Sequence, residues 1–242
     1  MKRDIAERIL YEDNHLIIVN KESSEIVQGD KTGDMPLGDI VGAYIKKRDN
    51  KPGNVFIGVP HRLDRPTSGI VILAKTSKAL SRMNELFRKN EVRKTYWAVL
   101  CGCPEKTEDT LNDSLRRDRK QNKSYSCAPG REDSKKASLS YRILLQHGRY
   151  TLAEVDLHTG RHHQIRVQFS ARGYSIKGDL KYGASQANPG GSIHLHARKV
   201  TFIHPVKKEE LSITAPVPSH DLLWREVEKE VEKERAAGSP AG

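Results

Sequence analysis

Cysteine, aromatic residues and long apolar runs are all scarce in this chain of 242 residues. The three cysteines, Cys101, Cys103 and Cys127, are an odd number without C-x-x-C spacing, which argues against a disulfide framework and a structural zinc site. The longest purely apolar run, Ile70 to Ala74, suits a strand and is too short for a membrane span. No apolar segment follows the charged N-terminus, so we expect no signal peptide and a cytoplasmic location.

Positive charge, by contrast, is abundant. Forty-two Lys and Arg face 31 Asp and Glu, a formal net charge of +11, which favours a polyanionic partner. Aromatics make up only 6% of the chain, so a stacking platform for single-stranded nucleic acid is not expected. Recognition of folded RNA through its shape and phosphates fits this composition better. The sequence has neither a P-loop nor a G-x-G-x-x-G motif, so we expect no nucleotide site.

The hydrophobic pattern predicts many strands and few helices. We expect helices over 40–45, 77–90, 162–172 and 221–235, and strands over 9–11, 16–19, 55–59, 70–74, 92–101, 137–145, 150–157, 193–203 and 211–214. The polar stretch 104–136 is interpreted as a flexible basic loop that follows an RNA backbone, with a merely solvated loop as the alternative. The pattern indicates an α+β protein with a mixed, largely antiparallel sheet and helices packed on it.

Nine residues, His61-Arg62-Leu63-Asp64-Arg65-Pro66-Thr67-Ser68-Gly69, place one carboxylate between two arginines immediately before an apolar strand. We refer to them as the signature loop. An acid held at the end of a buried strand is a common way to fix a reactive carboxylate. The alternative is a surface turn in which Asp64 and the arginines only neutralise one another.

Three segments resemble motifs of the RluA family of RNA pseudouridine synthases, in the family's order. The signature loop is similar to the family's H-R-L-D segment; Thr159-Gly160-Arg161-His162-His163-Gln164-Ile165-Arg166-Val167 is similar to T-G-R-(T/S)-H-Q-I-R-V; and Lys94-Thr95-Tyr96-Trp97-Ala98-Val99-Leu100 with Gly102 is similar to K-x-Y-x-A-x-V-x-G. The resemblance runs from about Ile9 to Pro216 and implies the pseudouridine synthase fold. It predicts one catalytic domain over 1–220, followed over 221–242 by a helix and a tail disordered from residue 236, and a compact family member without an N-terminal RNA-binding module.

The resemblance implies that a uridine in structured RNA is flipped out and isomerised to pseudouridine without a cofactor. Asp64 would act at the ribose, either by attacking C1′ or by removing the 2′ proton, and the sequence leaves both routes open. By the same resemblance Arg166 pairs with Asp64 and orients it, and Tyr96 stacks beneath the target base. For Tyr96 the alternative is ordinary packing of a strand tyrosine.

RNA contacts are predicted from the resemblance and from charge. Arg62 would fill the space that the flipped base leaves, or contact a phosphate. The other predicted contacts are basic or motif residues: Arg65, Lys75, Lys94, Arg116, Arg117, Arg119, Lys120, Arg161, His163 and Gln164. The RNA would be a stem-loop of ribosomal RNA, transfer RNA or both, bound by a monomer with no protein partner.

Two segments depart from the family pattern. His162 stands where Thr or Ser is common, and a surface imidazole is the simplest interpretation. Glu22-Ser23-Ser24-Glu25 replaces the P-x-G of N-K-P-x-G, which predicts a looser, acidic loop. His194 and His196 alternate along a strand, but no further ligand stands at a suitable spacing, so we expect no metal.

Two other functional classes compete with the isomerase. An RNA-binding assembly factor that kept the fold without the activity should have lost the acid, its arginine or the tyrosine, and all three are present. A glycosidase-like hydrolase would need a second carboxylate beside Asp64, and the signature loop holds only one.

Overall fold

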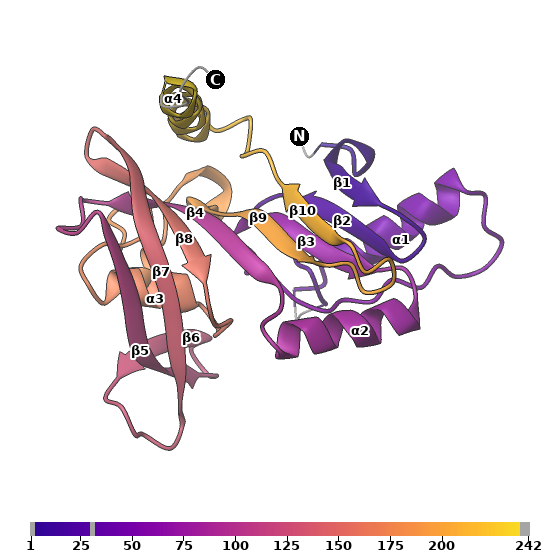
Figure 1. Ribbon diagram of the computed structural model, residues 1–242, viewed down its shortest axis with the longest axis horizontal. Coiled ribbons are helices and arrows are strands. Elements are labelled where there is room, and N and C mark those ends of the chain that lie inside the picture. Colours follow the sequence, from indigo (N-terminus) through magenta and orange to yellow (C-terminus); the bar gives the residue numbers. More distant parts are fainter. Residues whose placement is uncertain (1–2, 30–31, 238–242) are drawn as a thin grey trace. The chain divides into compact units, whose positions relative to one another are not determined.

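The computed structural model describes residues 3–29 and 32–237 (Figure 1). The chain forms two compact units. The first comprises Met1–Lys94 and Ala197–Pro216, and the second comprises Thr95–His196 and Val217–Gly242. The chain therefore leaves the first unit, builds the second, returns to the first and ends in the second.

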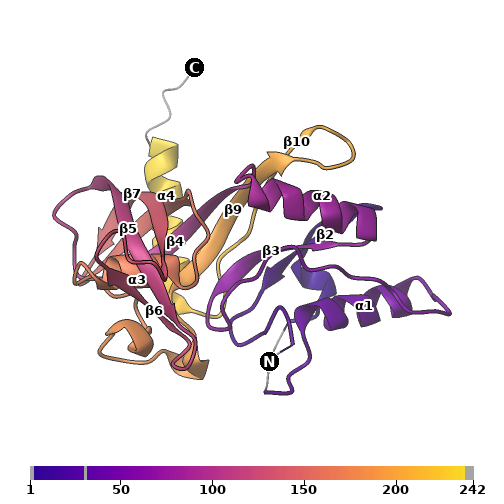
Figure 2. The same cartoon turned by 90° about the horizontal axis from the view of Figure 1, so that it is seen from below.

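The sheet of the first unit has the strand order β1 (Ile9–Glu12), β2 (Leu16–Lys21), β3 (Ser68–Ala74) and β9 (Leu195–Ile203), and β10 (Glu210–Thr214) also pairs with β9. The pairs β1–β2, β2–β3 and β9–β10 are antiparallel. Every residue of β2 and β3 is buried. In Figure 2, these strands run between α1 (Leu37–Arg48) and α2 (Ser77–Arg88). Covering on both faces explains why β3 is apolar without a break from Ile70 to Ala74 instead of alternating.

The helices of the first unit confirm the predictions made from capping and periodicity. Thr76 precedes α2, and its hydroxyl oxygen accepts a hydrogen bond from the amide of Ala79 at 3.1 Å. The predicted strand over 55–59 is wrong, because only Gly58 pairs there, in an isolated bridge with Ala74. A side chain at Gly58 would meet Leu80, so the backbone passes close to α2 at this position.

The sheet of the second unit has the order β4 (Arg93–Cys101), β8 (Tyr150–Leu157), β7 (Ser134–His147), β5 (Glu108–Asp118) and β6 (Lys123–Cys127), with all these neighbours antiparallel. The strands β5 and β6 form a hairpin within the stretch expected to be a flexible loop, so that prediction is wrong. In β6 only Ser124 is buried. Backbone pairing holds β6 in place, which leaves no apolar period in the sequence to reveal it.

A register shift in β7 allows this strand to pack against a different helix on each face of the sheet. Tyr141 pairs with Val155, but after the shift between Ile143 and Leu145, Leu145 pairs with Leu152. Because an extra residue reverses the side to which side chains point, Tyr141 packs against Phe169 of α3 (Gln164–Ser170), whereas Leu145 packs under α4 (Leu222–Ala237).

The core beneath α4 joins strand residues to one helical face. Trp224, Val227 and Val231 of α4 pack with Trp97 and Val99 of β4. The helix begins with a cap, since the carboxylate of Asp221 accepts a hydrogen bond from the amide of Trp224 at 3.1 Å. Among the described residues, the remaining elements are three short 3₁₀ helices, η1 (Ala6–Arg8), η2 (Leu180–Tyr182) and η3 (Pro189–Gly191).

The predicted α+β class, with largely antiparallel strands and flanking helices, is confirmed. The domain boundary at residue 220 stays a prediction. Residues 236 and 237, expected to be disordered, belong to α4, and the rest of that predicted tail, 238–242, lies outside the described residues. Within the part of the chain that the structure describes, no helix combines the length and apolarity needed to cross a membrane.

Candidate active site

The signature loop presents Asp64 at the entry to β3. The amide of Thr67 donates to the carbonyl oxygen of Asp64 at 3.0 Å and closes a turn. Leu63 is buried and Asp64 is half-buried, so the turn anchors one side chain in the core and directs its neighbour elsewhere. Thr67 and Ser68 are also buried, and the loop therefore continues without a break into the core strand.

The buried Lys21 holds the signature loop through hydrogen bonds to backbone carbonyl oxygens. The ammonium group of Lys21 donates to the carbonyl oxygens of Glu22 and Glu25, each at 2.9 Å, and of Arg65, at 3.2 Å. Its side chain is fully buried, so three carbonyl dipoles replace the water that a lysine normally binds. The amide of Ser24 adds a hydrogen bond to the same Arg65 carbonyl at 2.9 Å.

The segment over 22–25 is firmly held, which corrects the expectation of a looser loop. Glu25 is buried and pairs with Arg8, with Oε2 and Nη1 2.7 Å apart. The same carboxylate oxygen accepts the amide of Glu22 at 3.1 Å. Ser24 takes the left-handed conformation with φ of 73°, at the position where the family has glycine. The backbone shape thus persists without glycine, stabilised by the buried ion pair and by Lys21.

The two arginines of the signature loop differ in their surroundings. Arg65 donates through Nη2 to Asp34 at 2.5 Å and to Thr32 at 2.7 Å. Arg62 is exposed, and its one described hydrogen bond, to Gln28, is long at 3.4 Å. Arg62 is consequently the more available of the two for a phosphate or for a gap in an RNA stack.

His61, the first residue of the signature loop, is held by β3 and α2, and its ring is influenced by the charge of Lys94. The Nε2 atom of His61 accepts the amide of Ile72 at 2.9 Å, and its ring stacks on Phe87 with centroids 4.6 Å apart. Burial, with a smaller contribution from the charge of Lys94, lowers the pKa of His61 to about 3. Burial also lowers the pKa of Lys94. The neutral imidazole thus acts as a fixed acceptor that ties the loop to β3.

Lys75 is placed less favourably for a role beside Asp64. It follows the C-terminal end of β3, whereas Asp64 precedes the N-terminal end, and seven residues of strand span roughly 20 Å. Its ammonium group pairs with Glu12 at 2.6 Å and donates to the Asp13 carbonyl oxygen at 2.7 Å. Its contact with RNA stays a prediction that this placement does not support.

Tyr96 and Arg166, the other predicted catalytic residues, belong to the second unit. Tyr96 is buried in β4 and points away from Trp97 and Val99, the residues under α4. Arg166 is buried in α3 and makes a two-pronged ion pair with Asp179, with Nε–Oδ2 at 2.6 Å and Nη2–Oδ1 at 2.8 Å. Such a paired geometry fixes the guanidinium plane.

Tyr182 supports Arg166 and its helix. Its ring lies under the guanidinium group, 5.0 Å from centroid to Cζ. Its hydroxyl accepts the Ser124 amide at 2.8 Å and lies 2.9 Å from Nδ1 of His163. Sequence analysis missed both Asp179 and Tyr182. They lie in an irregular segment without hydrophobic period, so only the fold brings them to α3.

Hydrogen bonds of the Gln164 side chain hold the segment over 159–164, which leads into α3. The side-chain carbonyl of Gln164 accepts from the Thr159 hydroxyl at 2.7 Å and the Arg161 amide at 3.0 Å, while its amide donates to the Ser138 carbonyl at 3.0 Å. His163 is left-handed, with φ of 56°, and burial, followed by the charge of Arg166, lowers its pKa to about 2. The contacts of Gln164 and His163 with the protein indicate that both residues position this segment. Their predicted contact with RNA stays a prediction that these contacts do not support.

The predicted RNA-binding cations of the second unit gather on hairpin β5–β6 and beside it. Arg116 and Arg117 lie near the end of β5, and Arg119 and Lys120 are exposed in the turn that follows. Arg116 lies 5.8 Å from the Tyr125 ring centroid, which leaves its charge partly accessible. Arg161 is exposed, and its Nε donates to the Lys136 carbonyl at 2.9 Å.

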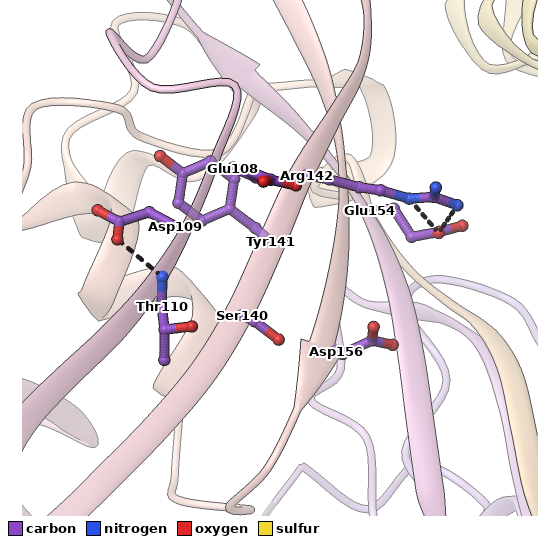
Figure 3. Close-up of a pocket in the computed structure, with 8 residues that line it drawn as sticks. All are labelled: Glu108, Asp109, Thr110, Ser140, Tyr141, Arg142, Glu154 and Asp156. Atoms are coloured by element: carbon purple, nitrogen blue, oxygen red, sulfur yellow. Dashed lines mark hydrogen bonds and ion pairs between the residues drawn. The ribbon is translucent and has the colours of Figure 1, made fainter.

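A cavity of about 470 Å³ lies on another part of the second unit (Figure 3). Four carboxylates line it, Glu108, Asp109, Glu154 and Asp156, and Figure 3 shows Arg142 reaching Glu154 through two contacts of 2.6 and 3.0 Å. This excess of negative charge does not suit RNA phosphates. None of the predicted site residues lines it.

His194 has a structural role. Its ring stacks on Trp224 with centroids 5.2 Å apart, and Nε2 lies 3.1 Å from the carboxylate of Asp221. Across the described ranges, 3–29 and 32–237, no cluster of three His, Cys, Asp or Glu side chains could hold a metal ion.

Known proteins are similar to this chain in sequence and in fold. The RNA pseudouridylate synthase family matches residues 15–171. An uncharacterised RNA pseudouridine synthase of Synechocystis is 32% identical over 88% of this chain, and the ribosomal large subunit pseudouridine synthase C of Vibrio cholerae is 34% identical over 88%. The match spans 66% of the length of each of these relatives.

The structure of human RNA pseudouridylate synthase domain containing 4 superimposes with a TM-score of 0.74 at 25% identity, covering 89% of this chain and 90% of that one. The resemblance carried by the three motifs is thereby confirmed over most of the chain. The protein belongs to the RNA pseudouridylate synthase family.

Proposed function

We propose that this protein isomerises specific uridines to pseudouridine in structured RNA, with Asp64 acting at the ribose. The observation that carries the proposal is the placement of Asp64. In a chain of this family, the H-R-L-D carboxylate sits in a closed turn that Lys21 and Ser24 hold from one side and β3 continues on the other. A carboxylate fixed in this way suits chemistry at a glycosidic carbon.

The reaction breaks the bond from C1′ to N1 and forms the bond from C1′ to C5. A proton leaves C5 and N1 gains one, so the atoms balance without an oxidant, a reductant or an energy carrier. Tyr96 and Arg166 serve the same reaction, Tyr96 against the base and Arg166 by orienting charge. Attack on C1′ and removal of the 2′ proton both remain compatible with a carboxylate at position 64.

Ribosomal RNA of the large subunit is the proposed substrate, supported by the ribosomal large subunit activity for which the Vibrio cholerae relative is named. Transfer RNA is the alternative that the experiment separates. The exposed Arg62, Arg119 and Lys120 support binding through phosphates. We further propose that the protein works as a monomer in the cytoplasm, where ribosomal RNA is modified.

Release of tritium from RNA labelled at uridine C5 tests the proposal. Large-subunit ribosomal RNA and transfer RNA, taken separately from cells lacking the protein, would each be incubated with the wild type, Asp64→Asn and Asp39→Asn. Asp39 is an exposed acid in the first turn of α1 and provides a matched control. We expect release with the wild type and Asp39→Asn, and a loss of at least about a thousandfold with Asp64→Asn.

RNA affinity should stay within a few-fold for Asp64→Asn, because the carboxylate contributes chemistry and not attraction to phosphates. A large loss of affinity would make Asp64 a structural residue. No release from either RNA, with tight binding intact, would support an RNA-binding assembly factor in place of an isomerase.

A further inference from the structure

His162 connects the segment before α3 to the tip of hairpin β5–β6. Its Nδ1 lies 2.9 Å from the hydroxyl of Ser124, and its Nε2 lies 3.1 Å from Oδ1 of Asn122. Both partners are on the hairpin, about 40 residues away in sequence. The ring also stacks on His163, with centroids 3.7 Å apart and planes inclined by 23°. The expectation of a plain surface imidazole is therefore wrong.

The hydrogen-bonding roles around His162 follow from its partners. Oδ1 of Asn122 can only accept, and it also receives Nη2 of Arg117 at 3.2 Å. Nε2 of His162 must therefore carry a hydrogen, and in the neutral ring Nδ1 accepts the Ser124 hydroxyl hydrogen. Because a hydroxyl can equally accept, a doubly protonated ring would keep both contacts.

The other contacts of the hairpin tip are local or come from one exposed lysine. The amide of Gln121 donates to Oδ1 of Asp118 at 3.0 Å, the hydroxyl of Tyr125 donates to Oε1 of Gln121, and Nζ of Lys181 lies 3.5 Å from the carbonyl oxygen of Gln121. Asn122 closes the turn over 119–122 in the left-handed conformation, with φ of 47°. Its carbonyl oxygen accepts from the exposed Lys181 at 3.2 Å. Ser124, in contrast, is buried and is also held through its amide by Tyr182. His162 thus adds to these contacts a side-chain connection that joins the turn to the buried Ser124.

The attachment reaches α3, the helix that carries Arg166. In both views β6 lies beside α3 (Figures 1 and 2). The amide of Ser124 meets Tyr182, whose ring lies under Arg166, and His162 itself stands four residues before Arg166. Thr or Ser, the common residue at position 162 in the family, has one hydroxyl on a short side chain. It cannot engage Asn122 and Ser124 from both sides as an imidazole does.

We propose that His162 is a positioning residue that locks the turn over 119–122, so that Arg119 and Lys120 meet the RNA in one fixed geometry relative to α3. The proposal rests on the proposed function, since it names the hairpin as an RNA contact of that reaction. A fixed turn avoids the ordering cost that a mobile one would incur on binding.

The test compares His162→Thr with the wild type in two measurements. Hydrogen exchange of the backbone amides reports on the turn, and kinetics with tritiated, in vitro transcribed large-subunit ribosomal RNA separate kcat from KM. We expect exchange over 119–122 to quicken about tenfold while Ser124 changes little, because Tyr182 still holds it. KM should rise about three- to tenfold with kcat within about twofold.

Two further variants make the result specific. His158→Thr is the matched control, because Nε2 of that exposed histidine contacts the Ser140 hydroxyl at 2.8 Å, remote in sequence from the turn. It should change neither measurement. Asn122→Gly removes the acceptor but keeps the left-handed backbone, and we expect it to add little to His162→Thr in the double variant, since both break one connection.

Unchanged exchange over 119–122 in His162→Thr would overturn the proposal, and so would faster exchange with an unchanged KM. If the wild type released no tritium, the proposed function would be wrong independently of the role of His162. RNA affinity, measured by filter binding, would then test whether His162 locks the turn for RNA binding. A three- to tenfold weaker affinity for His162→Thr would support the lock, and an equal affinity would overturn it.

Discussion

At the scale of single residues, the signature loop around Asp64 is held by the buried Lys21 and by its own first residue, His61. Lys21 gathers three carbonyl oxygens, and His61 accepts an amide of β3 while its ring stacks on Phe87. Both groups have exchanged hydration for fixed partners inside the protein. These contacts hold the loop in place, and for His61 the burial also disfavours the protonated ring.

His61 should make the stability of the protein fall in mild acid. Its pKa is about 3 in the folded protein, against 6.5 ordinarily. Above pH 6.5 the ring is neutral whether the chain is folded or not. As the pH falls from 6.5 towards 3, the unfolded chain binds a proton that the folded chain excludes, so the free energy of unfolding decreases.

Urea denaturation near neutral pH and at about pH 5 measures this effect. We expect His61→Gln to be less stable than the wild type near neutral pH, because it loses the stacking on Phe87, but to lose less stability on acidification. His158→Gln, at an exposed position, should follow the wild type. An equal pH-dependent loss for wild type and His61→Gln would assign the acid sensitivity to other groups.

At the scale of elements, β3 depends on one glycine. Gly69 has φ of 111°, and a Cβ there would collide with the backbone of Ala197 in β9, 2.5 Å from its nitrogen. We expect Gly69→Ala to lower the free energy of unfolding by more than about 3 kcal/mol, through both the collision and the unfavourable φ. Gly53 is the control, because a Cβ there would meet no atom within 4 Å, and Gly53→Ala should change stability by less than about 0.5 kcal/mol. Equal effects in urea denaturation would contradict the close approach.

The helix α4 depends on its cap. Burial raises the pKa of Asp221, but the hydrogen bonds from His194 and the Trp224 amide outweigh it and bring the pKa to about 2. Asp221→Ala should cost about 1–2 kcal/mol, measured by chemical denaturation, whereas Asp221→Asn keeps an acceptor and should cost less. The contribution of the carboxylate is present above pH 3.8 and is lost as the pH falls from there towards 2. A difference between wild type and Asp221→Ala that persisted undiminished at about pH 2 would contradict an ionised cap.

For the molecule as a whole, the charge of +11 coexists with a concentrated acidic surface. Within the second unit, Glu108, Glu154 and Asp156 line the cavity, while Arg117, Arg119 and Lys120 lie on the hairpin. Net charge therefore understates the attraction that the hairpin exerts on phosphates.

RNA binding should accordingly weaken steeply with salt. Replacing Arg119 and Lys120 together by alanine should weaken the affinity and reduce the slope of log K against log salt concentration by about one to two. Arg88 and Lys89, an equally exposed Arg-Lys pair at the end of α2, are the control, and their replacement should leave the slope within about half a unit of that of the wild type. Equal changes in the two double variants would indicate a general charge effect instead of contact by the hairpin.

The amino-acid sequence alone determined the family, the class of the fold and the elements with strong periodicity. The all-apolar run of β3 and the three- and four-residue spacing of Leu80, Met83 and Phe87 in α2 identify these elements, because burial of one face or of both leaves a period in the chain. Asp64 could be identified from the sequence because the residues of the signature loop are neighbours along the chain.

Tertiary structure decided what depends on backbone pairing and on residues far apart. Hairpin β5–β6 was expected to be a loop, because β6 is held by backbone pairing and buries only Ser124, which leaves no hydrophobic signal in the sequence. Arg166 contacts Asp179 and Tyr182, which no local pattern relates to it. The same holds for His162, which contacts Ser124 and Asn122. Hydrogen bonds and ion pairs between distant polar groups form only once the fold has brought them together, and they are therefore visible only in three dimensions.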